Sequence, residues 1–292
     1  MENTFAGLPV ELLEYLLSLF LAQRDFKSLK SLACVNALFC TISQRLLLRK
    51  AYLPEHKFFP NIPSPPPSYH FLHDLDRSPH LAEYIRSLTL ERSWQDVRAR
   101  GGSRNDPPMS EVSDDSVAHV LQRFNGLQKF AVFGRKSQIS KKPSQPSAWT
   151  SFSLLFQKSL IQCISSPNLI ELDLTAIGDF PASMLAQCTA LTHLSVTSLA
   201  LNEGSTEEAH TSTRRKLEYL HLEDMGFSKG ILSWLGISDV FDITHISDLS
   251  LSIDIAKTMY EAGVSAFGWT NLKHLRLVAD VKGEFLVPQY LS

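Results

Sequence analysis

The chain has 292 residues, of which 44% are hydrophobic and 20% are charged. This balance excludes an intrinsically disordered protein, and the length allows one or two domains. A formal net charge of −2 excludes a general electrostatic attraction to nucleic acid or to anionic membranes.

The N-terminus and the cysteines predict an intracellular protein, in the cytoplasm or the nucleus. The first apolar run is interrupted by Pro9, Glu11 and Glu14, so it does not resemble a signal peptide. No apolar stretch approaches the roughly 18 residues of a membrane helix. The cysteines show no C-x-x-C spacing and are expected to be reduced, mostly buried thiols. They are Cys34, Cys40, Cys163 and Cys188.

The first unit in chain order is a block of three short helices between Leu8 and Tyr52. Pro9 lies where a first helix begins, and leucines recur on one face of that helix. Asp25 and Asn36 can cap the second and third helices. A core of this size is marginal by itself and would gain from packing on a partner.

The block begins with Leu8-Pro9-Val10-Glu11-Leu12-Leu13 and ends near Val35-Asn36-Ala37-Leu38-Phe39. With Leu16, Leu29 and Leu32 between them, these runs resemble the F-box motif, which docks on the Skp-type adaptor of an SCF ubiquitin ligase. The resemblance implies that nine residues form the adaptor interface or its supporting core. They are Leu8, Pro9, Leu12, Leu13, Leu16, Leu29, Leu32, Val35 and Phe39. Periodicity leaves open which of them face the adaptor.

Six of the 15 prolines lie between Pro54 and Pro67, and they favour a stiff, extended segment. We therefore predict a helical module at 1–53, a Pro-rich linker at 54–68 and a second unit at 69–292.

The second unit repeats the frame L-x-x-L-x-L. Copies begin at Ile85, Leu127, Leu169, Leu191, Leu217, Ile246 and Leu272. The last four spacings, 22 to 29 residues, are those of leucine-rich repeats, and the two earlier spacings of 42 residues indicate loop insertions. Polar runs at 98–113 and 136–150 predict such loops. Helical patterns precede the strands, so we predict an α/β fold: an irregular leucine-rich-repeat solenoid with a curved parallel sheet.

The expected turn residue of this repeat is absent. The frame normally continues with Asn or Cys three residues on, but none of the seven copies has either. The positions hold Ser93, Arg135, Ile177, Leu199, Met225, Asp254 and Asp280. The turns must therefore be satisfied in another way. With its F-box-like start and Pro-rich linker, the whole chain resembles the F-box/leucine-rich-repeat proteins of the fungal type.

Strand alternation places two residues of each frame on the inner face of the sheet. The candidates for target binding on this face are Glu171, Asp173, His193, Tyr219, His221, Asp248, His274 and Arg276. Tyr219, His221 and Arg276 are the expected anchors, because aromatic residues and Arg dominate binding hot spots. Trp234 and Trp269 are expected in the core.

The same face offers little for catalysis. Asp173, His193 and His221 could together hold a metal, and Ser195 beside a histidine could be a nucleophile. Mixed polar residues are, however, usual on a solvated sheet, and no H-E-x-x-H, G-x-S-x-G or phosphate-binding loop is present. We expect no enzyme activity, no metal and no cofactor.

The resemblance implies a substrate-recruiting subunit of an SCF-type, cullin-based E3 ubiquitin ligase. Its partners would be a Skp-type adaptor, through it a cullin, and a protein target whose identity the sequence leaves open. No nucleic acid or membrane partner is expected. The alternative is a leucine-rich-repeat scaffold unrelated to ubiquitin, in which the N-terminal helices only cap the solenoid.

Overall fold

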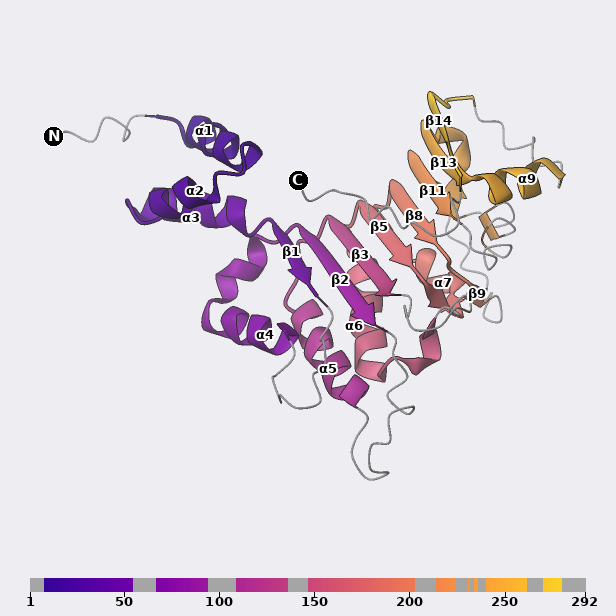
Figure 1. The fold of residues 1–292 in the computed structure, drawn as a ribbon, viewed down its shortest axis with the longest axis horizontal. Helices are drawn as coiled ribbons and strands as arrows, with labels where there is room; N and C mark the ends of the chain where they lie inside the picture. The colour runs from indigo at the N-terminus through magenta and orange to yellow at the C-terminus, as the bar shows by residue number, and fades with distance from the viewer. Residues whose placement is uncertain are drawn as a thin grey trace.

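A computed structural model describes residues 8–54, 67–93, 109–135, 147–202, 214–223, 231, 234–235, 240–261 and 270–279. Over these residues the chain is an α/β protein built on a large sheet of parallel strands. Three N-terminal helices project from one end of the sheet, and later helices lie along one of its faces (Figure 1). The α/β class and the parallel sheet predicted from the sequence are confirmed.

The N-terminal helices are α1 (Val10–Ala22), α2 (Phe26–Leu32) and α3 (Ala37–Leu47). They enclose a hydrophobic core of their own. Its buried members are Leu13, Leu17, Leu29, Phe39 and Ile42. The three-helix block expected from the sequence is therefore present, and it folds around side chains that it supplies itself.

Both predicted helix caps are formed. The Oδ1 atom of Asp25 accepts a hydrogen bond from the Ser28 amide at 3.0 Å, and that of Asn36 accepts one from the Phe39 amide at 2.9 Å. Each cap satisfies an amide that has no partner within its helix. Hydrogen bonds from the side chain of Ser28 and from its amide also hold the pKa of Asp25 below its ordinary value.

The large sheet has eight strands, which lie side by side in chain order. The strands are β1 (Lys50–Leu53), β2 (Ser87–Ser93), β3 (Lys129–Arg135), β5 (Glu171–Thr175), β8 (His193–Thr197), β11 (Tyr219–Glu223), β13 (Asp248–Ser252) and β14 (His274–Val278). Each of the seven predicted frames begins two residues before its strand. Its first apolar residue therefore lies in the turn that enters the sheet, and its other two lie in the strand itself.

One face of the sheet is covered by helices. They are α4 (Pro67–Arg77), α5 (Met109–Leu121), α6 (Leu154–Ile164), α7 (Ala182–Leu185) and α9 (Ile253–Glu261), with short 3₁₀ turns at Pro79–Glu83, Trp149–Ser151 and Ile243–His245. Short paired segments lie beyond the strand ends. They are β4 (Ser147–Ala148), β6 (Ile177–Gly178), β7 (Phe180–Pro181), β9 (Leu201–Asn202), β10 (Arg215–Lys216) and β12 (Phe241–Asp242).

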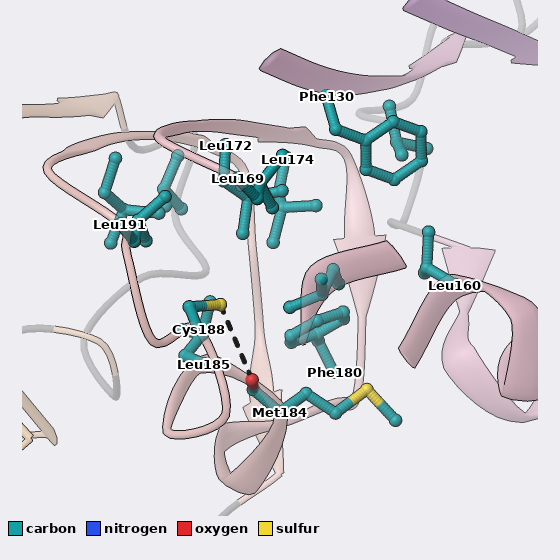
Figure 2. Packing of buried hydrophobic residues seen from close by; sticks show 14 of the residues in the cluster. Phe130, Leu160, Leu169, Leu172, Leu174, Phe180, Met184, Leu185, Cys188 and Leu191 are labelled. Carbon is teal, nitrogen blue, oxygen red and sulfur yellow. Dashed lines mark hydrogen bonds between the residues drawn. The ribbon is translucent and has the colours of Figure 1, made fainter. Parts of the chain in front are cut away.

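The core between sheet and helices is continuous from Leu53 to Met259. Figure 2 shows its centre, where Leu172 and Leu174 of β5 lie near Phe130 of β3 and Leu160 of α6. Burying such side chains is the main favourable term in the folding of this half.

The cysteines are all free, and two of them lie in the core. Burial raises the pKa of Cys163 and of Cys188 to about 12. The Cys188 thiol donates to the Met184 carbonyl at 3.7 Å, drawn as a dashed line in Figure 2. The sequence predicted mostly buried thiols, but in the helical module Cys34 is exposed and Cys40 is half-buried.

The boundary of the helical module lies earlier than predicted. Residues of β1 pair with β2, and Leu53 joins the sheet core. The two cores divide between Leu47, which packs on the helical core, and Leu48, which packs on the sheet core. The run from Leu48 to Leu53 is itself a copy of the frame with Ala51 in the middle, and this signal was missed.

The predicted linker and loops are described only at their ends. Residues 55–66 of the linker lie outside the described residues, and Pro67 already begins α4. Of the predicted loop at 98–113, residues 109–113 belong to α5, whereas 98–108 are outside the described residues. The second predicted loop, at 136–150, ends in strand β4 and in Trp149. Trp149 is buried because its ring packs edge-on against those of Phe152 and Phe180, at centroid distances of 5.4 and 5.2 Å.

The turns that lack Asn are completed by backbone hydrogen bonds between repeats. Ala176 and Ser198, each directly after a strand, adopt left-handed conformations with φ of 57° and 51°. Their amides donate to the carbonyls of Thr197 and Glu223 on the next strand, at 2.8 and 2.9 Å. Residues Ile177 and Leu199, which occupy the expected Asn positions, are fully buried. Met225 and Asp280 lie outside the described residues, and Asp254 lies in α9.

Candidate protein-binding surfaces

Helix α1 is apolar on more of its surface than its own module can bury. Leu13 and Leu17 point into the helical core, with exposures of 2% and 3%. Leu12 and Leu16, which precede them by one residue, are 43% and 39% exposed. One residue corresponds to about 100° around a helix, so the two pairs form separate rows. The outer row has no partner within the described residues that buries it.

The structure sorts the nine residues predicted for adaptor binding into two groups. Those buried or half-buried support the module, and they are Leu13, Leu29, Phe39, Leu8 and Leu32. Those exposed are available to a partner, and they are Pro9, Leu12, Leu16 and Val35. The sequence interpretation missed five further exposed apolar residues on the same helices. These are Val10, Tyr15, Leu19, Phe26 and Leu38.

The exposed apolar residues are unevenly distributed along the chain. Of the fifteen large hydrophobic residues that are exposed in the described part of the chain, eight lie between Val10 and Leu38. A signal for this was available in the sequence. Helix α1 reads VELLEYLLSLFLA and has only two charged residues, so its apolar surface exceeds one core-facing stripe. This concentration of exposed apolar residues makes the module a candidate interaction surface.

Contacts between charged and aromatic side chains hold α3 in place. Arg45 pairs with Glu14 of α1 at 2.6 Å. Its guanidinium also lies 5.8 Å from the ring centroid of Tyr84, which precedes β2. Because these groups are partly exposed, each contact contributes less than about 1 kcal/mol, so they orient the module more than they stabilise it.

The second surface is the sheet face that carries no helices, called here the inner face. Strand pairing aligns its residues in rows that run across the strands. The first row is Lys50, Ser87, Lys129, Glu171, His193, Tyr219, Asp248 and His274, and the second is Tyr52, Thr89, Ala131, Asp173, Ser195, His221, Ser250 and Arg276. The eight residues predicted for target binding therefore occupy neighbouring positions on one face.

An aromatic pair marks the centre of the first row. The rings of His193 and Tyr219 stack, with centroids 5.7 Å apart and planes 19° from parallel. The Nδ1 atom of His193 is 2.8 Å from the Thr192 hydroxyl. Both rings are half-buried, so they form an ordered platform on the inner face.

Charged pairs lie on both sides of this platform. On one side, Lys129 pairs with Glu171 at 2.7 Å. On the other, the Nδ1 atom of His274 is 2.8 Å from the Asp248 carboxylate. A further carboxylate, Glu223, lies 3.5 Å from His221 and was missed because it falls one position beyond the frame.

Asp173 is the most desolvated carboxylate of this face. Its burial raises the pKa of the carboxyl above its ordinary value, and a hydrogen bond from Ser195 and the positive charges of His221 and Lys129 oppose that shift. The Ser195 hydroxyl is thus engaged with Asp173. Across the described residues, no group of three or more His, Cys, Asp or Glu side chains has an arrangement suited to a metal ion.

The last strand, β14, differs from the others because its apolar side chains are exposed to solvent. Leu275 and Leu277 of β14 are each 55% exposed, although their register partners Leu249 and Leu251 on β13 are buried. Arg276 lies between them on the inner face and is also exposed. Trp234 is buried in the sheet core as expected, and Trp269 lies outside the described residues.

The fold and these surfaces define an α/β protein with an ordered parallel sheet, an apolar helical surface and a polar sheet face. Comparison with protein-family models, with curated proteins and with solved structures gave no match. Among the helices in the described part of the chain, none combines the length and the apolar character required to cross a bilayer.

Proposed function

We propose that this protein is a substrate-recruiting subunit of an SCF-type, cullin-based ubiquitin ligase. Helices α1–α3 act as an F-box that binds a Skp-type adaptor, and the leucine-rich-repeat sheet binds a target protein. The protein itself makes and breaks no bonds. It acts by proximity, because the adaptor holds one end near the ligase while the inner face holds the target.

The observation that carries this proposal is the outer apolar surface of the helical module. Eight of the fifteen exposed large hydrophobic residues of the described chain lie in this module, seven on its three short helices and Val35 in the connection between α2 and α3. Leaving their exposed surface in water is unfavourable, and burying what remains of each against a partner would contribute on the order of 1 kcal/mol. They include Leu12, Leu16 and Val35, which also belong to the motif that resembles an F-box.

The separate core of the module favours this function over a simple cap. A cap is needed because a repeat array exposes apolar surface at its ends, and it acts by packing on that surface. The module instead buries Leu13, Leu17 and Leu29 among its own helices, and the cores divide between Leu47 and Leu48. Its unburied leucines therefore favour an external partner.

The test is a pull-down of the full chain with a purified Skp-type adaptor. One variant carries Leu12→Ala, Leu16→Ala and Val35→Ala, which remove exposed side chains only. A matched control carries Leu154→Ala, Ile170→Ala and Ile253→Ala, which are exposed on the sheet half. Each triple should change stability little, since the residues are solvent-exposed.

We expect the wild type and the control to be retained and the module variant to lose at least about tenfold in affinity, because truncated interface anchors often cost more than 1.4 kcal/mol. If neither the wild type nor the variants are retained while circular dichroism shows all three folded, the ubiquitin-ligase function is wrong. The helices would then be a cap of a leucine-rich-repeat scaffold.

A further inference from the structure

The central part of the inner face is acidic. Four carboxylates from β5, β11 and β13 lie on it, and no Lys or Arg occupies an inner-face position on these strands or on β8, which lies between β5 and β11. The carboxylates belong to Glu171, Asp173, Glu223 and Asp248. The nearest cationic residues in the rows are Lys129 on β3 and Arg276 on β14, one at each margin.

The acidic positions bracket the aromatic platform. In the first row the order is Glu171, His193, Tyr219, Asp248, with His193 and Tyr219 stacked. Neighbouring strands lie about 4.8 Å apart, so Glu171 and Asp248 are separated by roughly 14 Å. An extended chain of about four residues covers this distance. The rings supply apolar, polarisable contact, and the carboxylates supply charge at both ends.

The inner face also leaves its buried charge incompletely compensated. Glu171 and Asp248 have partners at the margins, Lys129 and His274. Asp173 lies deeper, and burial raises its pKa although the Ser195 hydroxyl, His221 and Lys129 oppose that shift. A cation placed above Asp173 would stabilise its ionised form.

We propose that the inner face binds a basic segment of the target protein, with Arg or Lys side chains seated across the His193–Tyr219 platform between Glu171 and Asp248. The proposal rests on the proposed function, since it specifies the target that this ligase subunit recruits. Arg fits best, because its planar guanidinium bonds carboxylates through two parallel hydrogen bonds and also stacks on aromatic rings.

The margins limit the length of the basic segment. Lys129 lies on one side of the four central strands and Arg276 on the other, so further positive residues of a target would meet like charges there. The preferred segment therefore has a basic centre of about four residues between neutral or acidic flanks. A long polybasic tract is not the best ligand.

The experiment measures fluorescence anisotropy of the full chain with labelled nine-residue peptides. The probe is a Gly/Ser peptide with three central arginines, and the controls replace arginine by citrulline, which is neutral, or by glutamate. The test variant is Glu171→Gln/Asp248→Asn. Its matched control is Glu83→Gln/Asp179→Asn, which removes the same charge from exposed residues away from the inner face.

We expect the arginine peptide alone to bind, and we expect Glu171→Gln/Asp248→Asn to weaken it about tenfold or more, since each charge-assisted hydrogen bond is worth about 1.5–3 kcal/mol. The control variant should bind as the wild type does. If both variants weaken binding of the arginine peptide equally, the effect is one of net charge alone. If the citrulline peptide binds as tightly as the arginine peptide, the carboxylates do not recognise a positive charge. Either result overturns the inference.

The adaptor pull-down separates this inference from the proposed function. The variant Glu171→Gln/Asp248→Asn should be retained by the adaptor as well as the wild type is, because the helical module is unchanged. Retention of the wild type by the adaptor without binding of the arginine peptide would overturn the inference and leave the ligase function in place. If the wild type does not bind the adaptor, the proposed ligase function is wrong.

Discussion

The helical module and the sheet bury their apolar residues to different extents. The helical core has five buried side chains, whereas the sheet core continues without interruption from Leu53 to Met259. Each sheet repeat shares its apolar residues with the repeats on either side, so only the ends remain open. The three helices have no such neighbours, and their excess leucines stay at the surface. Small size, together with the apolar composition of α1, therefore leaves apolar residues on the surface of the module.

The two surfaces also differ in the kind of recognition that they favour. The outer row of α1 presents Leu12 and Leu16, which favour non-directional burial against another apolar surface. The inner face presents carboxylates and stacked rings at spacings set by strand pairing, which favour directional contacts. Affinity for a common adaptor and specificity for a target would thus come from different halves of the chain.

The largest effect is expected in the sheet core. Phe130 is fully buried, so Phe130→Ala should lower the free energy of unfolding by about 3–5 kcal/mol. This corresponds to a fall in Tm of roughly 10 °C for a chain of this size, measurable by calorimetry. Phe133→Ala is the control, because Phe133 is on the same strand but half-buried on the opposite face. Equal losses would mean that the core does not stabilise the sheet as described.

A smaller and local effect is expected in the helical core. Leu29→Ala should cost about 2–5 kcal/mol, because Leu29 is completely buried among α1–α3. Hydrogen exchange should then show lost protection in these helices and unchanged protection in β3 and β5. The control is Leu38→Ala, which truncates an exposed residue of the same module. Equal deprotection of the sheet strands would show that the two cores unfold as one unit.

A helix cap should contribute less again. Asn36→Ala removes the acceptor of the Phe39 amide and should cost about 1 kcal/mol, seen as faster amide exchange in α3. Asn36→Ser retains a side-chain acceptor and should exchange like the wild type. If alanine and serine behave alike, the hydrogen bond at this position does not stabilise the helix.

The smallest effect, and one that depends on pH, concerns Asp173. Its folded pKa is raised by burial, so the ionised carboxyl destabilises the fold at pH 7. This cost declines as the pH falls through the folded pKa and vanishes once the unfolded carboxyl is protonated too. Asp173→Asn should therefore raise Tm slightly at pH 7 and leave it unchanged near pH 3. A lower Tm at pH 7 would mean that the ionised carboxylate is a net stabilising group.

Local sequence patterns were sufficient to predict most helices and strands but not to predict which residues form the exposed surfaces. The frames starting at Leu169 and Leu191 predicted β5 and β8 because alternation along a strand is a property of adjacent residues. The frame at Leu48 was missed because Ala51 replaces the middle leucine and weakens the pattern. The start of α5 was missed because residues 109–113 are mostly polar and lie next to a Pro-rich run.

The sequence by itself determined the α/β class, the parallel strands, the caps at Asp25 and Asn36, and the residues that can reach the inner face. These depend on periodicity and on contacts within a few residues. Only the tertiary structure decided that β1 joins the sheet, that Leu12 stays exposed while Leu13 is buried, and that His193 stacks on Tyr219. Those outcomes depend on which elements pack together and in what register, and both are set by contacts between residues far apart in the chain.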